Sequence, residues 1–200
     1  MKKKFVLSTT LVMLFWTSLI PAASASELPW NDEDRDYNNK LYLGKEINYL
    51  IDSDNEYTVS IPNAVQKLMY PSSGSNPLIL SKTTNYMSSK MDFYQYTDSD
   101  YINGLTRVFR KDSSGQYYLM TVSEKDKYDW RYGEVFLNDY YLKNMSSADR
   151  EEVIIHEMLH VYGLKDLYDY ENKWSIMYYN DASTATGVTT DANYVLNAKY

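Results

Sequence analysis

After residue 45, the pattern of apolar and polar residues predicts a mixture of strands and helices. The segment KEINYLID alternates with the period of two that is typical of a strand, and PNAVQKLMY has the wider apolar spacing of a helix. The segment ILSKTTNYMSSK has an ambiguous pattern, for which we expect a helix. Further strands are predicted in MDFYQYT, LTRVFR, QYYLMTV and EVFLN, with YPSSGSNP as a loop and with KDSSG as the turn of a hairpin between LTRVFR and QYYLMTV.

The segment NMSSADREEVIIHEMLHVYG has the clearest helical pattern. Ser146 to Asp149 fits a capping box, and Glu151 and Glu152 are expected in the first turn, where the helix dipole favours acidic groups. Gly163 stands where a helix commonly ends with glycine. We therefore predict a helix over about residues 147–162. A second capped helix is predicted in VTTDANYVLNAKY, with Val195, Leu196 and Tyr200 available for the core.

The N-terminal region has the layout of a secretory signal peptide. Lys2 to Lys4 form a basic start, an apolar run follows, and Ala23-Ser24-Ala25 offers a cleavage site. The alternative, an uncleaved membrane anchor, is disfavoured because the apolar run is short for a spanning helix. We expect a signal peptide at residues 1–25, an acidic leader or short pro-segment at 26–44, and one folded domain at 45–200.

Charge and cysteine content narrow the classes of function. Without residues 1–25, the chain carries 17 basic and 27 acidic side chains, a formal net charge of −10. Such a surface repels nucleic acid and anionic lipid, so we expect neither nucleic acid nor a stable membrane association after signal cleavage. The chain has no cysteine, so no metal ligand here is a thiolate. A secreted, extracellular monomer is expected.

The segment HEMLHVYGLKD contains both histidines of the chain. On a helix, His156 and His160 lie one turn apart on the same face, where both imidazoles reach one ion. Glu157 lies about 100° round the helix from His156, suitable for accepting a proton from a water beside the metal without ligating the ion. The alternative is a helix that carries two histidines with only structural roles.

A catalytic zinc site needs three protein ligands and an open position. The third ligand is an oxygen ligand, because the chain has no further histidine and no cysteine. Gly163 ends the helix and turns the chain back, which places Asp166 within reach of the ion. Asp169 and Glu171 are alternatives, and the position of the glycine turn favours Asp166.

These residues match the motif H-E-x-x-H-x-x-G-x-x-H/D, and the chain resembles the metzincin zinc proteases in the aspartate version found in snapalysin-like enzymes. SIMYY resembles the Met-turn of that family, which implies Met177 beneath the zinc and Tyr179 near it. Met177 as ordinary core and Tyr178 as the approaching tyrosine stay open. The resemblance implies an α+β fold with a twisted, mostly parallel sheet, an antiparallel edge strand, an active-site helix and a C-terminal helix.

The resemblance also implies a zinc metalloendopeptidase that acts on protein or peptide substrates. One Zn²⁺ would be held by His156, His160 and Asp166, with Glu157 as general base and Tyr179 assisting catalysis. QYYLMTV is the expected edge strand for an extended substrate. The rival reading is a secreted zinc-containing binding protein without catalytic activity, in which a further protein ligand closes the metal site.

Two further features of the sequence leave alternatives open. Asp32, Asp34 or Asp36 would block the zinc if the leader is an inhibitory pro-segment, as an aspartate does in astacins, but the leader is equally well explained as a disordered stretch. Ca²⁺ has candidate loops in TDSD and EKDKYD, although neither has the spacing of a recognised calcium loop.

Overall fold

The structure is a computed structural model that describes residues 36–37, 40–42, 44–179 and 183–200. The chain divides into two compact units, residues 1–30 and 31–200, and everything described belongs to the second. The expected signal peptide and residues 26–35 of the expected leader lie outside the described residues. Within the described part, no helix is long and apolar enough to cross a membrane.

The centre of the fold is a six-stranded sheet. In sequence order its strands are β1 (Glu46–Ile51), β2 (Ile79–Lys82), β3 (Ser89–Tyr96), β4 (Gly104–Lys111), β5 (Tyr117–Leu119) and β6 (Tyr132–Asn138), arranged as β2-β1-β3-β6-β4-β5. The pairs β1–β2, β1–β3 and β3–β6 are parallel, and β4 is antiparallel to both of its neighbours. The sheet is therefore mostly parallel, as expected. The antiparallel strand expected at the edge is β4. It lies one place inside the edge, because the short strand β5 pairs with residues 109–111 of β4.

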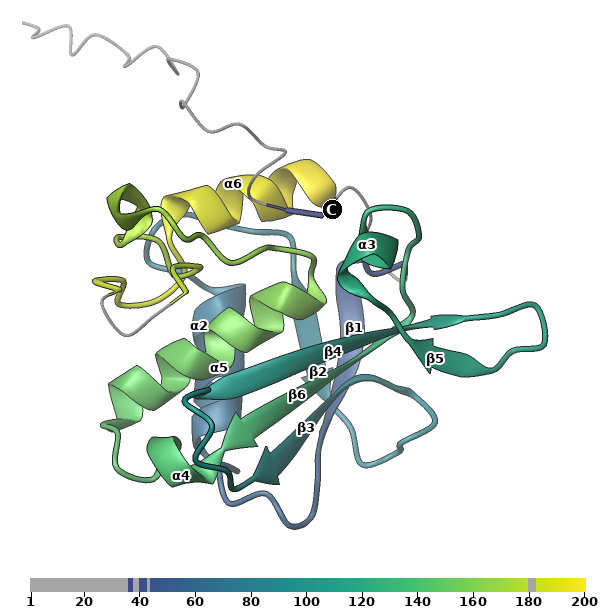
Figure 1. The fold of residues 1–200 in the computed structure, drawn as a ribbon, viewed down its shortest axis with the longest axis horizontal. Helices are drawn as coiled ribbons and strands as arrows, with labels where there is room; N and C mark the ends of the chain where they lie inside the picture. The colour runs from purple at the N-terminus through teal and green to yellow at the C-terminus, as the bar shows by residue number, and fades with distance from the viewer. Residues whose placement is uncertain (1–35, 38–39, 43, 180–182) are drawn as a thin grey trace, which may run out of the picture. The chain divides into compact units, whose positions relative to one another are not determined.

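The helices of the described part are α2 (Ser60–Met69), α3 (Val122–Lys125), α4 (Asp139–Leu142), α5 (Ser147–Val161), the 3-10 turn η1 (Tyr170–Asn172) and α6 (Thr190–Lys199). Helices α2 and α5 lie side by side, and α5 also packs on β4 and β6 (Figure 1). Strand residues alternate between the two faces of the sheet, and the alternate positions that are buried are Ile47, Tyr49, Met91, Phe93, Val108, Val135 and Leu137. The molecule is thus a mixed α+β fold whose main core lies between sheet and helices.

The prediction of a helix in ILSKTTNYMSSK is wrong. The segment forms β2, a turn and the first residues of β3. Only Leu80 of β2 is buried, so this short strand has too little alternation to be recognised. In the turn, Thr83 Oγ1 accepts from the Asn85 amide at 3.0 Å and Asn85 Oδ1 accepts from the Met87 amide at 3.0 Å. Such side-chain bonds to the backbone favour a turn over a helix.

The expected helix over residues 147–162 is confirmed as α5, with one correction. Ser146 caps it by accepting a hydrogen bond from the Asp149 amide at 3.2 Å. Glu151 and Glu152 lie beyond the first turn, so their expected role at the helix dipole is wrong. Glu151 is buried and instead forms an ion pair with Lys67 of α2 at 2.8 Å. This carboxylate fixes α5 against α2.

Residues ahead of position 45 also pack into the folded unit. Asp36 pairs with Leu164 in an isolated antiparallel bridge, and the Tyr37 amide donates to the Gly163 carbonyl at 2.8 Å. Lys199 of α6 forms an ion pair with Asp36 at 2.6 Å. Leu41 is 0% exposed and belongs to the hydrophobic core. The packed part of the chain therefore begins before the expected boundary at residue 45.

We predict that Leu41→Ala lowers the free energy of unfolding by about 2–5 kcal/mol, because it leaves a cavity in a fully buried site. Leu119→Ala is the matched control, since Leu119 is 53% exposed and its truncation should cost less than about 1 kcal/mol. Urea unfolding of both variants measures the difference. Equal losses would show that the segment around residue 41 does not belong to the core.

Candidate metal centre

Two glycines allow α5 to approach the sheet closely. A Cβ atom placed on Gly133 of β6 would lie 2.6 Å from a methyl carbon of Val161, and one placed on Gly104 of β4 would lie 2.6 Å from Cγ of Glu157. Neither strand position has room for a larger side chain. Because Glu157 and Val161 are one turn apart, one line of side chains along α5 rests directly on β4 and β6.

The end of α5 turns the chain back toward the helix. Gly163 has φ +94°, its amide donates to the His160 carbonyl at 3.0 Å, and the Leu164 amide donates to the Leu159 carbonyl at 3.1 Å. These two bonds form a Schellman motif, which needs a left-handed residue and therefore favours glycine at this position. The predicted turn at Gly163 is confirmed, and it directs the following residues, including Asp166, toward the histidines.

Backbone carbonyls orient both imidazole rings. The Nδ1 atom of His156 lies 2.7 Å from the Ile176 carbonyl oxygen, and Nδ1 of His160 lies 2.8 Å from the Leu164 carbonyl oxygen. A carbonyl oxygen only accepts, so each Nδ1 carries the hydrogen and donates it. In the neutral rings, both Nε2 atoms are left with a lone pair, which is the form that binds a metal.

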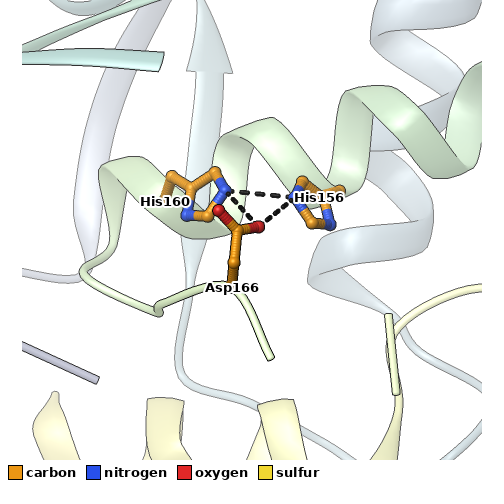
Figure 2. A group of neighbouring side chains, drawn as sticks. All are labelled: His156, His160 and Asp166. Carbon is orange, nitrogen blue, oxygen red and sulfur yellow. Dashed lines mark hydrogen bonds and ion pairs between the residues drawn. The ribbon is translucent and has the colours of Figure 1, made fainter. Parts of the chain in front are cut away.

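The three predicted ligands converge on one point (Figure 2). Asp166 Oδ1 lies 3.1 Å from Nε2 of His156 and 3.3 Å from Nε2 of His160, and the two Nε2 atoms are 3.1 Å apart. Ligand atoms at usual zinc distances in a tetrahedral site are about 3.3 Å from one another. The set therefore fits zinc in both spacing and chemistry. It is a candidate metal site with three protein ligands.

The electrostatics of the group also suit a cation. Burial opposes charge on Asp166, but without an ion an imidazole whose Nε2 carries a proton donates to this carboxylate, and such bonds from His156 or His160, with the positive charge of the ring, hold the pKa of this carboxyl well below its ordinary value. Burial likewise opposes charge on His156, yet the Asp166 hydrogen bond and the nearby Glu157 carboxylate raise the pKa of the imidazole. Negative charge therefore accumulates where the Nε2 lone pairs meet, and a positive charge at that point is stabilised.

Glu157 lies on the sheet side of α5 and is 6% exposed. Its carboxylate oxygen Oε2 is 2.7 Å from the hydroxyl of Thr106 on β4. Among the described residues, the group that could hold a metal contains His156, His160 and Asp166 but not Glu157. Glu157 thus follows a candidate ligand in the sequence without belonging to the ligand group, and its role as general base stays a prediction.

Met177 lies in a turn that contacts the metal-binding segment. It is 2% exposed, its carbonyl accepts from the Leu167 amide at 2.8 Å, and the Tyr178 amide closes the turn on the Ser175 carbonyl at 3.1 Å. The same turn presents the Ile176 carbonyl to His156. Met177 thus belongs to the core in a turn beside the candidate site, and its role beneath a zinc ion stays a prediction.

The tyrosines near this turn differ in exposure and contacts. Tyr178 is buried, whereas Tyr179 is 49% exposed and its ring centroid is 5.1 Å from that of Tyr168. Burial, the charge of Asp166 and a hydrogen bond with Asp166 raise the pKa of the Tyr168 phenol. Tyr168 therefore approaches a predicted ligand, and sequence reasoning missed it. Whether Tyr178 or Tyr179 assists catalysis stays a prediction.

Several alternatives named from the sequence do not reach the centre in the described part of the chain. Asp169 precedes η1 and Glu171 lies within it, and neither belongs to the metal-ligating group. Asp36 forms an ion pair with Lys199 and lies outside the metal-ligating group, and Asp32 and Asp34 lie outside the described residues. Where the structure describes them, the acidic loops 97–100 and 124–129 bring no three carboxylates together as a metal-binding group.

Supporting residues around the site come from distant parts of the sequence. Ser175 is 0% exposed, donates to Asp191 of α6 at 2.6 Å and accepts from the Met177 amide at 3.2 Å. Sequence reasoning missed Ser175, Asp191 and Thr106, for which no local signal exists. Gly104 did offer a local signal in the sequence, since a glycine within a strand often marks the close approach of another element.

We predict that the metal-free protein binds one Zn²⁺ and that Asp166→Ala weakens this affinity by about a hundredfold or more, because one of three ligands is lost. Asp169→Ala is the matched control and should leave the affinity unchanged. Competition with a chromogenic chelator measures both. A loss in the Asp169 variant alone would assign the third ligand differently.

No protein-family profile matches the chain, and no curated protein sequence matches it. Among solved structures, a match is the high choriolytic enzyme 1 of Oryzias latipes, the medaka fish, a hatching-enzyme zinc protease. The TM-score is 0.33 at 12% sequence identity, over 68% of this chain and 52% of the other, so this chain spans about half the length of that protein. At this level the likeness decides neither fold family nor function.

Proposed function

We propose that this chain is a zinc-dependent endopeptidase of the metzincin type. The observation that carries the proposal is the convergence of Asp166 Oδ1 with the Nε2 atoms of His156 and His160, all within 3.3 Å of one another. Each Nδ1 atom is held by a backbone carbonyl, so the ligand atoms are oriented before any ion arrives. Three ligands leave a fourth position for water or substrate, as catalytic zinc sites require.

The proposed chemistry divides between the ion and Glu157. When bound, zinc would make water more acidic and polarise the carbonyl of the scissile peptide. Glu157 accepts the proton of the attacking water and later gives it to the leaving amine. Its position one residue after His156, on the sheet side of α5 and outside the ligand group, supports this role. The rival role, a structural zinc, gives no function to this buried carboxylate.

An extended peptide would bind along β4 in this proposal. Strand β5 pairs only with residues 109–111 of β4, and in the described part of the chain no strand pairs with the outer side of residues 104–107. This stretch, which pairs only with β6 in the described part of the chain, contains Gly104 and Thr106, which contact Glu157. Strand addition supplies main-chain hydrogen bonds to a substrate of any sequence. Residues 104–107 thus replace QYYLMTV as our candidate for the substrate-binding edge.

The finer features of the proposal rest on the sequence. The basic and apolar start of the chain and Ala23-Ser24-Ala25 support secretion after cleavage of residues 1–25. The substrates are proteins or peptides, with one Zn²⁺ as the cofactor and a monomer as the working form. Residues 26–35 stay a candidate pro-segment, although residues 36–37 and 40–42 belong with the folded unit by their packing.

Addition of Zn²⁺ to the metal-free chain from Ser26 onward should restore cleavage of casein, while Glu157→Ala should bind zinc and cleave about 10²–10⁴-fold more slowly. Glu152→Ala is the matched control, since Glu152 lies on the same helix one turn before His156 and should leave the rate unchanged. Casein cleavage and zinc affinity are measured on the same samples. A wild type that binds zinc tightly and cuts neither casein nor short peptides would contradict the protease and favour the binding protein.

Tyr179→Phe should lower kcat by about tenfold or more with KM nearly unchanged, if its hydroxyl stabilises the negative charge that develops on the scissile carbonyl oxygen. Tyr179 is 49% exposed, whereas Tyr178 is 6% exposed and belongs to the buried residues. Tyr178→Phe is therefore the control and should retain kcat. The opposite pattern would assign the role to Tyr178, and steady-state kinetics on one peptide distinguishes the two.

A further inference from the structure

We propose that Thr106 is a positioning residue that holds the Glu157 carboxylate in the orientation needed for proton transfer. This inference rests on the proposed function and adds to it a residue outside the helix motif. Thr106 lies in β4, 51 residues before Glu157 in the sequence. Among the described residues its hydroxyl hydrogen-bonds to Glu157 and to neither histidine, so the proposed effect on proton transfer passes through Glu157.

The Thr106 hydroxyl has two acceptors on the same residue. It is 2.7 Å from Oε2 of Glu157 and 2.9 Å from the main-chain oxygen of Glu157. A hydroxyl has only one hydrogen to donate. The carboxylate is closer and carries charge, and hydrogen bonds to ionised acceptors are shorter and about twice as strong as those between neutral groups. The hydroxyl therefore donates to the carboxylate.

Gly104 completes the support on the same face of β4. A Cβ atom at this position would lie 2.8 Å from Oε1 and 2.9 Å from Cδ of Glu157, so the carboxylate occupies the space that a side chain would fill. Gly104 and Thr106 are two residues apart and point to the same side of the strand. One gives the carboxylate room, and the other fixes one of its oxygens.

The arrangement leaves the other oxygen of Glu157 available. Among the described residues, hydrogen bonds from side chains reach Oε2, and Oε1 lies over Gly104. A carboxylate with one oxygen fixed presents the second in one orientation, which removes rotational freedom that would otherwise be lost when the transition state forms. In the proposal, Thr106 restricts this rotation of the Glu157 carboxylate.

The test compares Thr106→Val, which keeps the shape but removes the hydroxyl, with Thr106→Ser, which keeps the hydroxyl. We expect Thr106→Val to lower kcat by about 10- to 100-fold, with KM and zinc affinity within about threefold of the wild type. Thr106→Ser should recover kcat to within about fivefold. In a Glu157→Ala background, Thr106→Val should have no further effect on the residual rate, because both residues act through one carboxylate.

A second measurement uses the metal-free protein and needs no activity. Thr106→Val should lower the melting temperature by a few degrees when Glu157 is present and by little when it is replaced by alanine. If the hydroxyl served only the main-chain carbonyl of residue 157, the loss would be equal in both backgrounds, since that carbonyl remains. Equal losses would overturn the proposal.

The outcomes separate this inference from the proposed function. An active wild type whose Thr106→Val variant keeps kcat would overturn the role of Thr106 and leave the protease standing. An inactive wild type that binds zinc would overturn the protease, and with it the catalytic role of Thr106. In that case the metal-free melting temperatures still decide whether Thr106 holds the Glu157 carboxylate.

Discussion

Two backbone carbonyl oxygens determine the geometry of the candidate metal centre. The Ile176 carbonyl binds Nδ1 of His156, and the Leu164 carbonyl binds Nδ1 of His160. If either Nδ1 were free, its ring could rotate and the Nε2 atoms would not meet 3.1 Å apart. The Schellman turn supplies one carbonyl, and the turn around Met177 supplies the other. Two turns that follow α5 in the sequence therefore orient both imidazole rings toward one point.

Helix α5 carries its candidate metal ligands on one face and the carboxylate proposed to transfer protons on another. The histidines face the returning chain with Asp166, and Glu157 faces β4, although His156 and Glu157 are adjacent in sequence. Contact with the sheet holds Glu157 in a fixed place, because Gly104 lies beneath it and Thr106 bonds it. The packing that makes the core thus also positions a side chain proposed to transfer protons.

The sequence was sufficient where the determining interactions are local. Ser146, Gly163 and the spacing of His156 and His160 act within one helix and its two ends, so α5 and the ligand set were predictable. It was insufficient where partners are distant: Glu151 was assigned to the helix dipole but pairs with Lys67, and Thr106 has no neighbour in sequence that reveals its contact. The short β2 was missed because a strand of four residues shows too little periodicity.

Without an ion, the ligand atoms of His156, His160 and Asp166 repel one another. This cost in free energy indicates that the three residues bind a metal and do not serve the stability of the fold alone. With hydrogen on both Nδ1 atoms, two Nε2 lone pairs and a carboxylate oxygen of Asp166 face one another within 3.3 Å, which is repulsive unless a proton or a cation lies between them. The raised pKa of His156 reflects this preference for positive charge. Zn²⁺ needs both Nε2 lone pairs, so protons compete with the ion and its binding should weaken as the pH falls. A site selected only for stability would avoid such a cluster, because apolar side chains of similar volume would avoid the repulsion and the burial of charge.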